Sequence, residues 1–351
     1  MHILLLGGSN AGVRDGWAAQ FAELAAGHRV DNRFLGAVGS LYGLMALMKL
    51  ERETAPLPDL IVFEYCLNDI LLLEAGVLRP ALIADALEAV TDFCARKGVG
   101  LLYLNLEPRP RDGRKQQRAI ERIKKLYETA ARRRGVAGLW LRDIFPEGLA
   151  ASHFQDENHL STEAAGRVTR ALLTQLHARV PAPEPRQEQA PRFDYVDATQ
   201  TFVLGPCVLR DLSSRVFDGP FLEIARGGTS FWPGEGSLVA LMLQSTDASG
   251  VYSIRAADRS VRKTPRSQMQ DIVRNLMLLH YVVGDLPADG EVEIAMPENE
   301  DDLMRLPANK GVLEAPARAP FEAQTLAIHG VIFWRDASLR ARLRDFVRRC
   351  L

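Results

Sequence analysis

Through the first half of the chain, short apolar runs alternate with longer segments whose apolar residues recur at helical spacing. This alternation is typical of βαβ units, in which helices join parallel strands. Strands are expected at residues 2–6, 29–35, 59–65, 99–106 and 136–141. Helices are expected at residues 11–26, 40–54, 77–96, 114–134 and 162–179. The pattern therefore predicts an α/β domain built on a five-stranded parallel sheet.

The pattern changes after residue 180, where residues 181–192 read PAPEPRQEQAPR. The four prolines of this stretch cannot continue a helix and favour an extended linker. Beyond it, short β-type runs such as QTFVLG, SLVALMLQ and LAIHGVIFW recur between turn signals. They predict a β-sandwich or jelly-roll-like domain at residues 193–351, after an α/β domain at residues 1–180. Helices at residues 267–279 and 338–351 are expected within the second domain.

Composition narrows the class of partner. The 43 Lys and Arg nearly balance the 44 Asp and Glu, so no field of the whole protein recruits nucleic acid or an anionic membrane. A length of 351 residues is enough for two domains with a core each. We expect a small molecule or a neutral polymer as partner, and the sequence leaves a homo-oligomer open.

The cysteines and the apolar runs bear on the compartment. The cysteines Cys66, Cys94, Cys207 and Cys350 are scattered, with neither metal-ligand spacing nor the density of a disulfide scaffold. No run approaches the roughly 20 apolar residues of a transmembrane helix, and the N-terminal run is too short for a signal peptide. A cytoplasmic protein without a metal or another cofactor is expected.

Four clusters of polar or small residues come after expected strands. They are Ser9, the stretch GAVGS at residues 36–40, CLND at residues 66–69 and DENH at residues 156–159. Ligands of an open parallel sheet bind outside the carboxyl ends of its strands. The four clusters are therefore expected at one edge of the sheet, where they can form a site.

The chemistry of these clusters is complementary. A serine hydroxyl becomes nucleophilic when a neutral imidazole takes its proton, and the imidazole needs an acceptor on its other nitrogen. His159 and Asp156, three residues apart before an expected helix, can supply both functions to Ser9. The N–H groups of Ser9 and Gly39 and the amide of Asn68 can hold the oxyanion that forms on an attacked ester carbonyl.

This order of residues resembles the SGNH, or GDSL-like, hydrolase superfamily from Met1 to about Arg179. GGSN resembles the nucleophile block of the family, LGAVGS its glycine block, CLND its asparagine block and DENHL its D-x-x-H-L ending. The resemblance implies a three-layer, flavodoxin-like fold and the same roles for the residues named above. It also implies acyl transfer, because family members are esterases, thioesterases, carbohydrate deacetylases and a few acyltransferases.

Three positions depart from the family pattern. Gly8 stands where the family usually has Asp, Cys66 where it usually has Gly, and Phe34 where Asn is frequent. Gly8 and Cys66 lie beside expected catalytic residues, so they bear on substrate fit and turnover. No triad or oxyanion residue is missing.

Further residues are expected beside the substrate: Asn10, Cys66, Arg109 and His153. Cys66 is expected to fill space, because no separate base is in sight to activate a second nucleophile. His153 follows Ala150 at the distance where His159 follows an acid, so His153 is not expected to be the base. Glu64 interrupts an apolar strand, and the sequence does not name its partner.

A dinucleotide site is the structural rival for the first cluster, because GGSNAG follows a strand. Its glycines do not make G-x-G-x-x-G, and no Gly-Lys-Ser/Thr follows for a phosphate loop. The rival therefore fails on spacing.

The sequence favours a serine esterase acting on O-acyl esters, with an O-acetyl ester of a carbohydrate as the expected substrate by analogy with family members. Two alternatives stay open. One is an O-acetyltransferase acting on polysaccharide or glycan precursors. The other is a catalytically inactive glycan-binding protein, whose aromatic clusters at residues 231–232, 280–281 and 333–334 stack on sugars instead of packing in the core.

Overall fold

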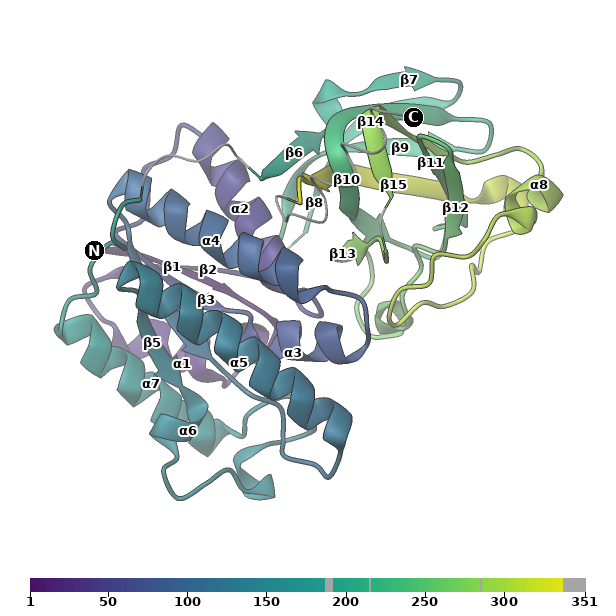
Figure 1. Ribbon diagram of the computed structural model, residues 1–351. Coiled ribbons are helices and arrows are strands. Elements are labelled where there is room, and N and C mark those ends of the chain that lie inside the picture. The colour runs from purple at the N-terminus through teal and green to yellow at the C-terminus, as the bar shows by residue number, and fades with distance from the viewer. Residues whose placement is uncertain (187–191, 215, 285, 337–351) are drawn as a thin grey trace, which may run out of the picture. The chain divides into compact units, whose positions relative to one another are not determined.

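The computed structural model describes residues 1–186, 192–214, 216–284 and 286–336. The chain divides into two compact units, residues 1–189 and 190–351 (Figure 1). The closing helix expected at residues 338–351 lies outside the described residues.

The first unit is a three-layer α/β structure whose parallel sheet has the order β2-β1-β3-β4-β5. The strands are β1 (His2–Gly7), β2 (Arg29–Phe34), β3 (Leu60–Glu64), β4 (Gly100–Asn105) and β5 (Ala137–Trp140). The helices are α1 (Trp17–Leu24), α2 (Ser40–Arg52), α3 (Cys66–Glu74), α4 (Pro80–Lys97), α5 (Arg114–Arg134), α6 (Leu141–Ile144) and α7 (Thr162–His177), with 3-10 turns η1 (Ser9–Gly12) and η2 (Ala151–His153). The strand order is flavodoxin-like and confirms the predicted fold class.

Burial of the strands explains the layers. All residues of β3 and β4 are buried, as expected of parallel strands that are covered on both faces. On one face, Ile3 packs with Trp17 of α1 and Val168 of α7. On the other face, α2 lies so close that a Cβ on Gly43 would be 2.4 Å from the Phe63 ring. Figure 1 shows α4 and α5 alongside α2 on this face.

Several helices begin elsewhere than predicted. The helix predicted at residues 11–26 is divided into η1 and α1. Gly12, the last residue of η1, packs on the Phe34 ring, and a Cβ on Gly12 would lie 2.2 Å from that ring. The helix predicted from residue 77 begins at Pro80, a residue suited to the first helical turn. The short helix α3 was not predicted, because its nine residues directly follow a buried strand.

The second unit is antiparallel and β-rich, as predicted. Its strands are β6 (Phe193–Asp197), β7 (Phe202–Leu204), β8 (Cys207–Ser213), β9 (Asp218–Ala225), β10 (Thr229–Ser245), β11 (Tyr252–Ala256), β12 (Arg259–Lys263), β13 (Leu276–Tyr281), β14 (Pro287–Ala295) and β15 (Thr325–Trp334). Short helical elements are η3 (Ala198–Gln200), η4 (Gln268–Asp271), α8 (Glu300–Arg305) and η5 (Phe321–Ala323). The first half of β10 pairs with β14 and its second half with β13 and β15, around a core that includes Trp232 and Phe333.

One predicted element of the second unit is wrong. Residues 267–279 do not form a helix, because Asn275 (φ 54°) turns the chain between η4 and β13. Side chains of the three aromatic clusters pack in the core: Trp232, Tyr281 and Trp334 are at most 4% exposed. These side chains are therefore unavailable for stacking on sugars.

The start of the proline-rich segment packs on the first unit, where an extended linker was expected. The Glu184 N–H donates to Arg134 O (2.8 Å), and Arg134 Nε donates to Glu184 O (2.9 Å). The Leu101 N–H of β4 donates to Pro181 O (3.4 Å). Residues 181–184 therefore run beside β4 and the end of α5.

Candidate active site

The loops that follow β1, β2 and β3 meet at the carboxyl edge of the parallel sheet. A Cβ on Gly36, after β2, would lie 3.5 Å from Ser9 Cβ, after β1. A Cβ on Gly39 would lie 2.2 Å from Asp69 Oδ1, on the helix that follows β3. The strand order reverses between β1 and β3, and ligands of such sheets bind at this point.

Ser9, His159 and Asp156 lie in series at hydrogen-bonding distances. Ser9 Oγ is 2.7 Å from His159 Nε2, and His159 Nδ1 is 2.7 Å from Asp156 Oδ2. Ser9 opens η1, whereas Asp156 and His159 belong to the loop before α7. The structure thus brings together the three residues that the sequence proposes as a triad.

The charge of Asp156 determines where the protons lie. Partial burial raises the pKa of this carboxyl, but hydrogen bonds from the Asn158 N–H and from His159 outweigh burial and hold the pKa below its usual value. An ionised carboxylate only accepts hydrogen bonds, so His159 Nδ1 carries the proton and donates it. In the neutral form of the ring, His159 Nε2 is then the nitrogen that accepts from the Ser9 hydroxyl, as a general base must.

Asn10 joins the serine turn to the histidine loop. Its Nδ2 donates to Asn158 O (2.8 Å), and its Oδ1 accepts from the Leu160 N–H (3.1 Å). These two partners flank His159 in the sequence, and Asn10 is only 3% exposed. Both ends of the amide are used inside the protein, which differs from the substrate contact expected for Asn10.

Asn68 packs against the serine turn from α3. A Cβ on Gly8 would lie 2.0 Å from Asn68 Oδ1, so a larger residue cannot occupy position 8 while Asn68 keeps this place. This contact gives a physical reason for glycine where the family usually has Asp. Asn68 is buried beside the residue that precedes Ser9, where the predicted oxyanion donor is needed.

Asp69 holds the turn that contains Gly39. Its Oδ1 accepts from the Ser40 N–H at the start of α2 (2.9 Å), and its Oδ2 accepts from the Tyr127 hydroxyl of α5 (2.8 Å). Burial raises the pKa of Asp69 to about 6, although these hydrogen bonds lower it. Because Asp69 Oδ1 stands where a Cβ of residue 39 would be, only glycine fits there.

Glu64 is a buried carboxyl under the serine turn. The Gly8 N–H donates to both Glu64 O and Glu64 Oε2, each at 3.1 Å. Burial raises the pKa of Glu64 to about 8, against the lowering effect of the Gly8 N–H. The partner that the sequence did not name is therefore the backbone next to Ser9.

Cys66 is the first residue of α3 and is completely buried. Burial, together with the nearby carboxyl of Asp69, raises the pKa of its thiol well above the ordinary value. A thiolate nucleophile is therefore excluded at neutral pH, and Cys66 fills space as expected.

Arg109 and His153 support the loops around the triad. The Arg109 N–H donates to Glu157 O (2.9 Å) and so braces the histidine loop through its backbone. The His153 ring packs on Phe145, with ring centroids 4.4 Å apart, and His153 Nδ1 accepts from the Ala150 N–H (3.1 Å). Neither contact involves the triad.

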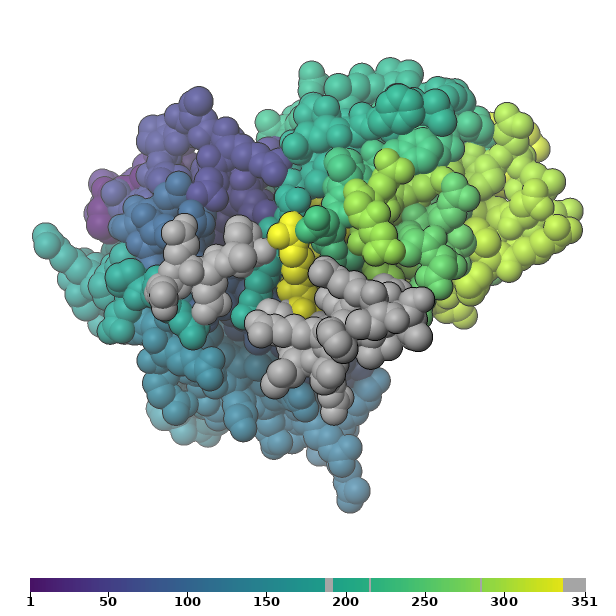
Figure 2. Space-filling view, turned by 45° about the horizontal axis from the view of Figure 1, so that its top comes forward, coloured from purple at the N-terminus to yellow at the C-terminus, as the bar shows by residue number. Residues whose placement is uncertain are grey.

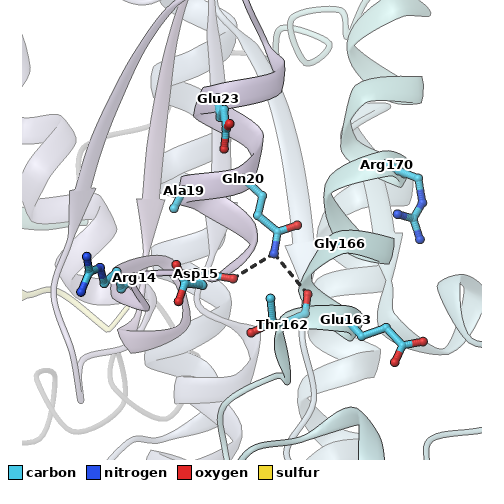
Figure 3. Close-up of a pocket in the computed structure, with 9 residues that line it drawn as sticks. All are labelled: Arg14, Asp15, Ala19, Gln20, Glu23, Thr162, Glu163, Gly166 and Arg170. Carbon is cyan, nitrogen blue, oxygen red and sulfur yellow. Dashed lines mark hydrogen bonds between the residues drawn. The ribbon is translucent and has the colours of Figure 1, made fainter.

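An open groove of about 740 Å³ lies between α1 and α7 (Figure 3). Most of its lining residues are polar or charged, and Gln20 Nε2 donates to both Asp15 O and Thr162 O, which joins α1 to the start of α7 (Figure 3). No triad residue lines this groove. It is therefore a feature of the surface separate from the candidate site.

Two further searches cover only the part of the chain that the structure describes. No group of three or more His, Cys, Asp or Glu there could hold a metal ion. No helix there is long and apolar enough to cross a membrane.

Comparison with solved structures finds similar folds. The crystal structure of CEX, a two-domain esterase active on acetylated mannans, has a TM-score of 0.61 at 14% identity, over 96% of this chain and 92% of that chain. TesA matches at 23% identity, over 51% of this chain and 99% of that chain, with a TM-score of 0.42. An acetyl xylan esterase, AlAXEase, matches at 16% identity, over 50% of this chain and 98% of that chain, with a TM-score of 0.40. No family model and no curated protein matches the sequence. The chain has a fold similar to that of the two-domain esterase CEX, and the three-layer, flavodoxin-like fold expected for its first unit is confirmed.

Proposed function

We propose that this protein is a serine esterase that uses Ser9, His159 and Asp156 as its triad. The observation that carries the proposal is the pair of 2.7 Å contacts from Ser9 Oγ through the His159 ring to Asp156. They lie at the edge of the sheet where ligands of flavodoxin-like folds bind. A serine held this way has a base for its proton and an acceptor that orients the base.

In the proposed reaction, Ser9 Oγ attacks the carbonyl carbon of the ester while His159 Nε2 takes the hydroxyl proton. Asp156 holds the ring and stabilises the imidazolium. The ring then protonates the leaving alcohol, the ester C–O bond breaks, and the acyl group stays on Ser9. A water molecule then attacks the acyl carbonyl carbon while the ring takes one of its protons. The ring returns this proton to Ser9 Oγ, the bond between Oγ and the acyl carbon breaks, and the carboxylic acid leaves.

Three groups are proposed to hold the carbonyl oxygen when it becomes negative: the N–H groups of Ser9 and Gly39 and the amide of Asn68. The Ser9 N–H opens η1, and it donates to no residue in the described ranges. Gly39 and Asn68 are supported through Asp69 and α3, so these donors are held in place before the charge develops. One such donor is typically worth about 3 kcal/mol of transition-state stabilisation.

An O-acetyl ester of a carbohydrate is the proposed substrate. The support is the similarity to CEX, which extends over both units and whose substrates are acetylated mannans. The second unit is included in that match, so the proposal concerns the chain with both units present.

The test compares hydrolysis of p-nitrophenyl acetate, butyrate and octanoate by the wild type and the variants Ser9→Ala and His159→Ala. We expect activity on the acetate and a loss of about 1,000-fold or more in both variants, because the triad acts as a unit. His153→Asn is the matched control, since this histidine lies in the same loop region outside the triad. It should stay within a few-fold of the wild type. Acetate release from acetylated mannan tests the carbohydrate.

Two outcomes would contradict hydrolysis as the function. Equal background rates in the wild type and both triad variants would leave a binding protein. Consumption of an acetyl donor that an added oligosaccharide acceptor accelerates beyond hydrolysis would identify a transferase.

A further inference from the structure

Helix α5 has an unusual distribution of charge. Its sequence, RKQQRAIERIKKLYETAARRR, contains nine basic and two acidic residues. Seven exposed basic residues form what we call the α5 basic face: Arg114, Lys115, Arg118, Arg122, Lys125, Arg132 and Arg133. At about 100° per residue they fall within an arc of about 100°, beside the buried arc that packs on the unit. Figure 1 shows α5 on the outside of the first unit, and Figure 2 shows the blue-teal atoms of this part of the chain on the surface.

The described part of the chain does not neutralise this face. None of the seven side chains has an ion pair with a described residue, whereas buried Arg134 on the same helix has two, to Glu88 and Asp92. Of the two acids of α5, Glu128 pairs with Arg142, and exposed Glu121, at the border of the face, accepts from the neutral amide of Gln117. One carboxylate therefore stands beside seven positive charges. The positive charges of the face are therefore available to an external partner.

Arg132 and Arg133 lie in the last turn, where the helix dipole favours basic side chains, but the placement of the other five charges is unfavourable for the helix itself. Arg114 and Lys115 occupy the first turn, where the helix dipole favours acidic side chains, and no acid is present there. Arg114, Arg118 and Arg122 follow one another at spacings of four, which sets like charges side by side. Helix stability does not account for the basic residues in the first half of α5, and a bound polyanion would relieve their repulsion.

The shape of the face favours a linear partner. From Arg114 to Arg133 the row extends over about 29 Å, since each helical residue rises about 1.5 Å. The only aromatic residue of α5, Tyr127, is buried, so the helix offers no ring on which bases could stack. No large apolar residue of α5 is among the exposed ones, as insertion into a membrane surface would need.

The basic face begins at the edge of the sheet that carries the triad. The loop from β4 leads to Arg114, and in this loop the Arg109 N–H donates to Glu157 O, two residues before His159. Arg111 pairs with Glu74 (3.0 Å) and reaches Glu157 at 3.8 Å. A polymer bound along α5 would therefore extend towards the loop that holds His159.

We infer that the α5 basic face binds an acidic, carboxylate-bearing polysaccharide, and that such a polymer carries the ester that Ser9 hydrolyses. The choice of a polysaccharide rests on the proposed esterase function, whereas the binding of a polyanion rests on the face alone. Near neutrality of the whole chain does not oppose this, because a local row of charges acts within a screening length of about 10 Å.

The test measures binding of polygalacturonate, which carries no ester, by isothermal titration calorimetry at low and at high salt. The face variant is Arg118→Glu/Arg122→Glu/Lys125→Glu. The control, Arg170→Glu/Arg274→Glu/Lys310→Glu, makes the same change in net charge at exposed residues elsewhere. We expect binding by the wild type and the control that weakens with salt, and a loss of at least about 10-fold in the face variant, because Lys and Arg contacts to a polyanion depend on salt.

Hydrolysis of p-nitrophenyl acetate separates the two proposals, since it needs no polymer. Both triple variants should retain it, and the KM for acetylated polygalacturonate should rise only in the face variant.

Equal binding of polygalacturonate by all three proteins would overturn the inference, as would tighter binding of duplex DNA or anionic vesicles at equal charge. A wild type that binds polygalacturonate through the face but hydrolyses no ester would overturn the proposed esterase and the claim that the polymer carries its substrate, and would leave the binding of an acidic polysaccharide standing. If the face variant does not fold, Gln in place of Glu at the same three positions gives the same test.

Discussion

At the scale of single residues, Asn10 links the turn of the proposed nucleophile to the loop of its base. Its amide bonds the backbone on both sides of His159, while its own backbone continues from Ser9. Ser9 and His159 are 150 residues apart in the sequence, and the Asn10 amide joins their two loops directly beside the 2.7 Å hydrogen bond between them.

Asn10→Ala should therefore lower kcat for p-nitrophenyl acetate by about 10- to 100-fold with little change in KM, because misplacement of the base affects the chemical step. Asn10→Asp keeps the acceptor for the Leu160 N–H and should lie between Asn10→Ala and the wild type. The rate of labelling of Ser9 by a fluorophosphonate should fall in parallel. A raised KM with unchanged kcat would instead support the substrate contact first expected for Asn10.

Gly8 is restricted by Asn68, which lies 2.0 Å from the place of a Cβ on residue 8. Gly8→Ala should lower the free energy of unfolding by about 1–3 kcal/mol through overpacking. In the background Asn68→Ala the same substitution should cost less, and a double-mutant cycle on urea unfolding measures the difference. Gly113→Ala is the control, because no atom lies within 4 Å of its Cβ position. Equal costs in both backgrounds would refute the contact.

The sequence could propose Ser9, His159 and Asp156, which the structure brings together, because the chemistry of a triad restricts both residue type and order. It did not identify what Asn10 and Glu64 do, because both bond to backbone groups, which any residue would supply. The sequence shows that glycine at position 8 departs from the pattern of the family that it resembles, but it does not show the cause. Its cause is a side chain 60 residues away, and such a contact requires the folded arrangement.

At the scale of elements, Arg134 ties the end of α5 to α4 and to the start of the proline-rich segment. Its Nη1 donates to Glu88 Oε1 and Asp92 Oδ1, both at 2.6 Å, and its Nε donates to Glu184 O. The Arg134 side chain is 3% exposed, whereas those of Glu88 and Asp92 are 20% and 40% exposed. Water can therefore hydrate the two carboxylates if the arginine is removed.

Arg134→Met should lower the free energy of unfolding by about 1–3 kcal/mol, less than the loss of a partner from a fully buried pair. Urea unfolding followed by circular dichroism measures it. Arg133→Met is the matched control, since this neighbour is exposed and should stay within about 0.5 kcal/mol of the wild type. Similar losses in both variants would mean that only general charge matters at this helix end.

Elements with a long, regular pattern were predictable. The bounds of α5 agree with the prediction, because its buried residues repeat at helical spacing over 21 residues. Residues 267–279 misled the prediction because Met269, Ile272 and Val273 are apolar at helical spacing yet exposed, Ile272 by 78%. Apolar spacing predicts a helix only when those residues are buried, and the sequence alone does not say whether they are.

At the scale of the whole molecule, the net charge says little about binding or about how stability depends on pH, whereas the placement of the charges determines both. The net charge of −1 conceals both the exposed basic face of α5 and two carboxyls, Glu64 and Asp69, that are buried under the candidate site. Buried carboxyls whose pKa values are raised link folding to pH. The folded protein holds protons on them that the unfolded chain has already released.

For Glu64 the pKa is about 8 in the folded protein and 4.5 in its ordinary state. Between these values the folded state binds more protons than the unfolded state, so the contribution of Glu64 to stability is fully present below about pH 4.5 and is lost as the pH rises through 8. Asp69, with a pKa of about 6, acts in the same direction at lower pH. Stability should therefore fall from mildly acidic to mildly alkaline solution.

Glu64→Gln isolates this term, because a neutral amide of the same shape replaces the protonated acid and does not titrate, while Asp69 contributes equally to both proteins. At pH 5 the two proteins should have nearly the same Tm. At pH 8.5 the wild type carries a buried charge on Glu64, whose described partner is the Gly8 N–H. The Tm of the variant should therefore lie about 2–4 °C or more above the Tm of the wild type, since about 1 kcal/mol corresponds to this shift in a domain of this size. Glu23→Gln, at an exposed site of α1, controls for the loss of one negative charge.

A Tm difference between Glu64→Gln and the wild type that is the same at both pH values would show that Glu64 is ionised in the folded protein throughout. In that case the serine turn rests on a carboxylate, and the hydrogen bond from Gly8 is charge-assisted.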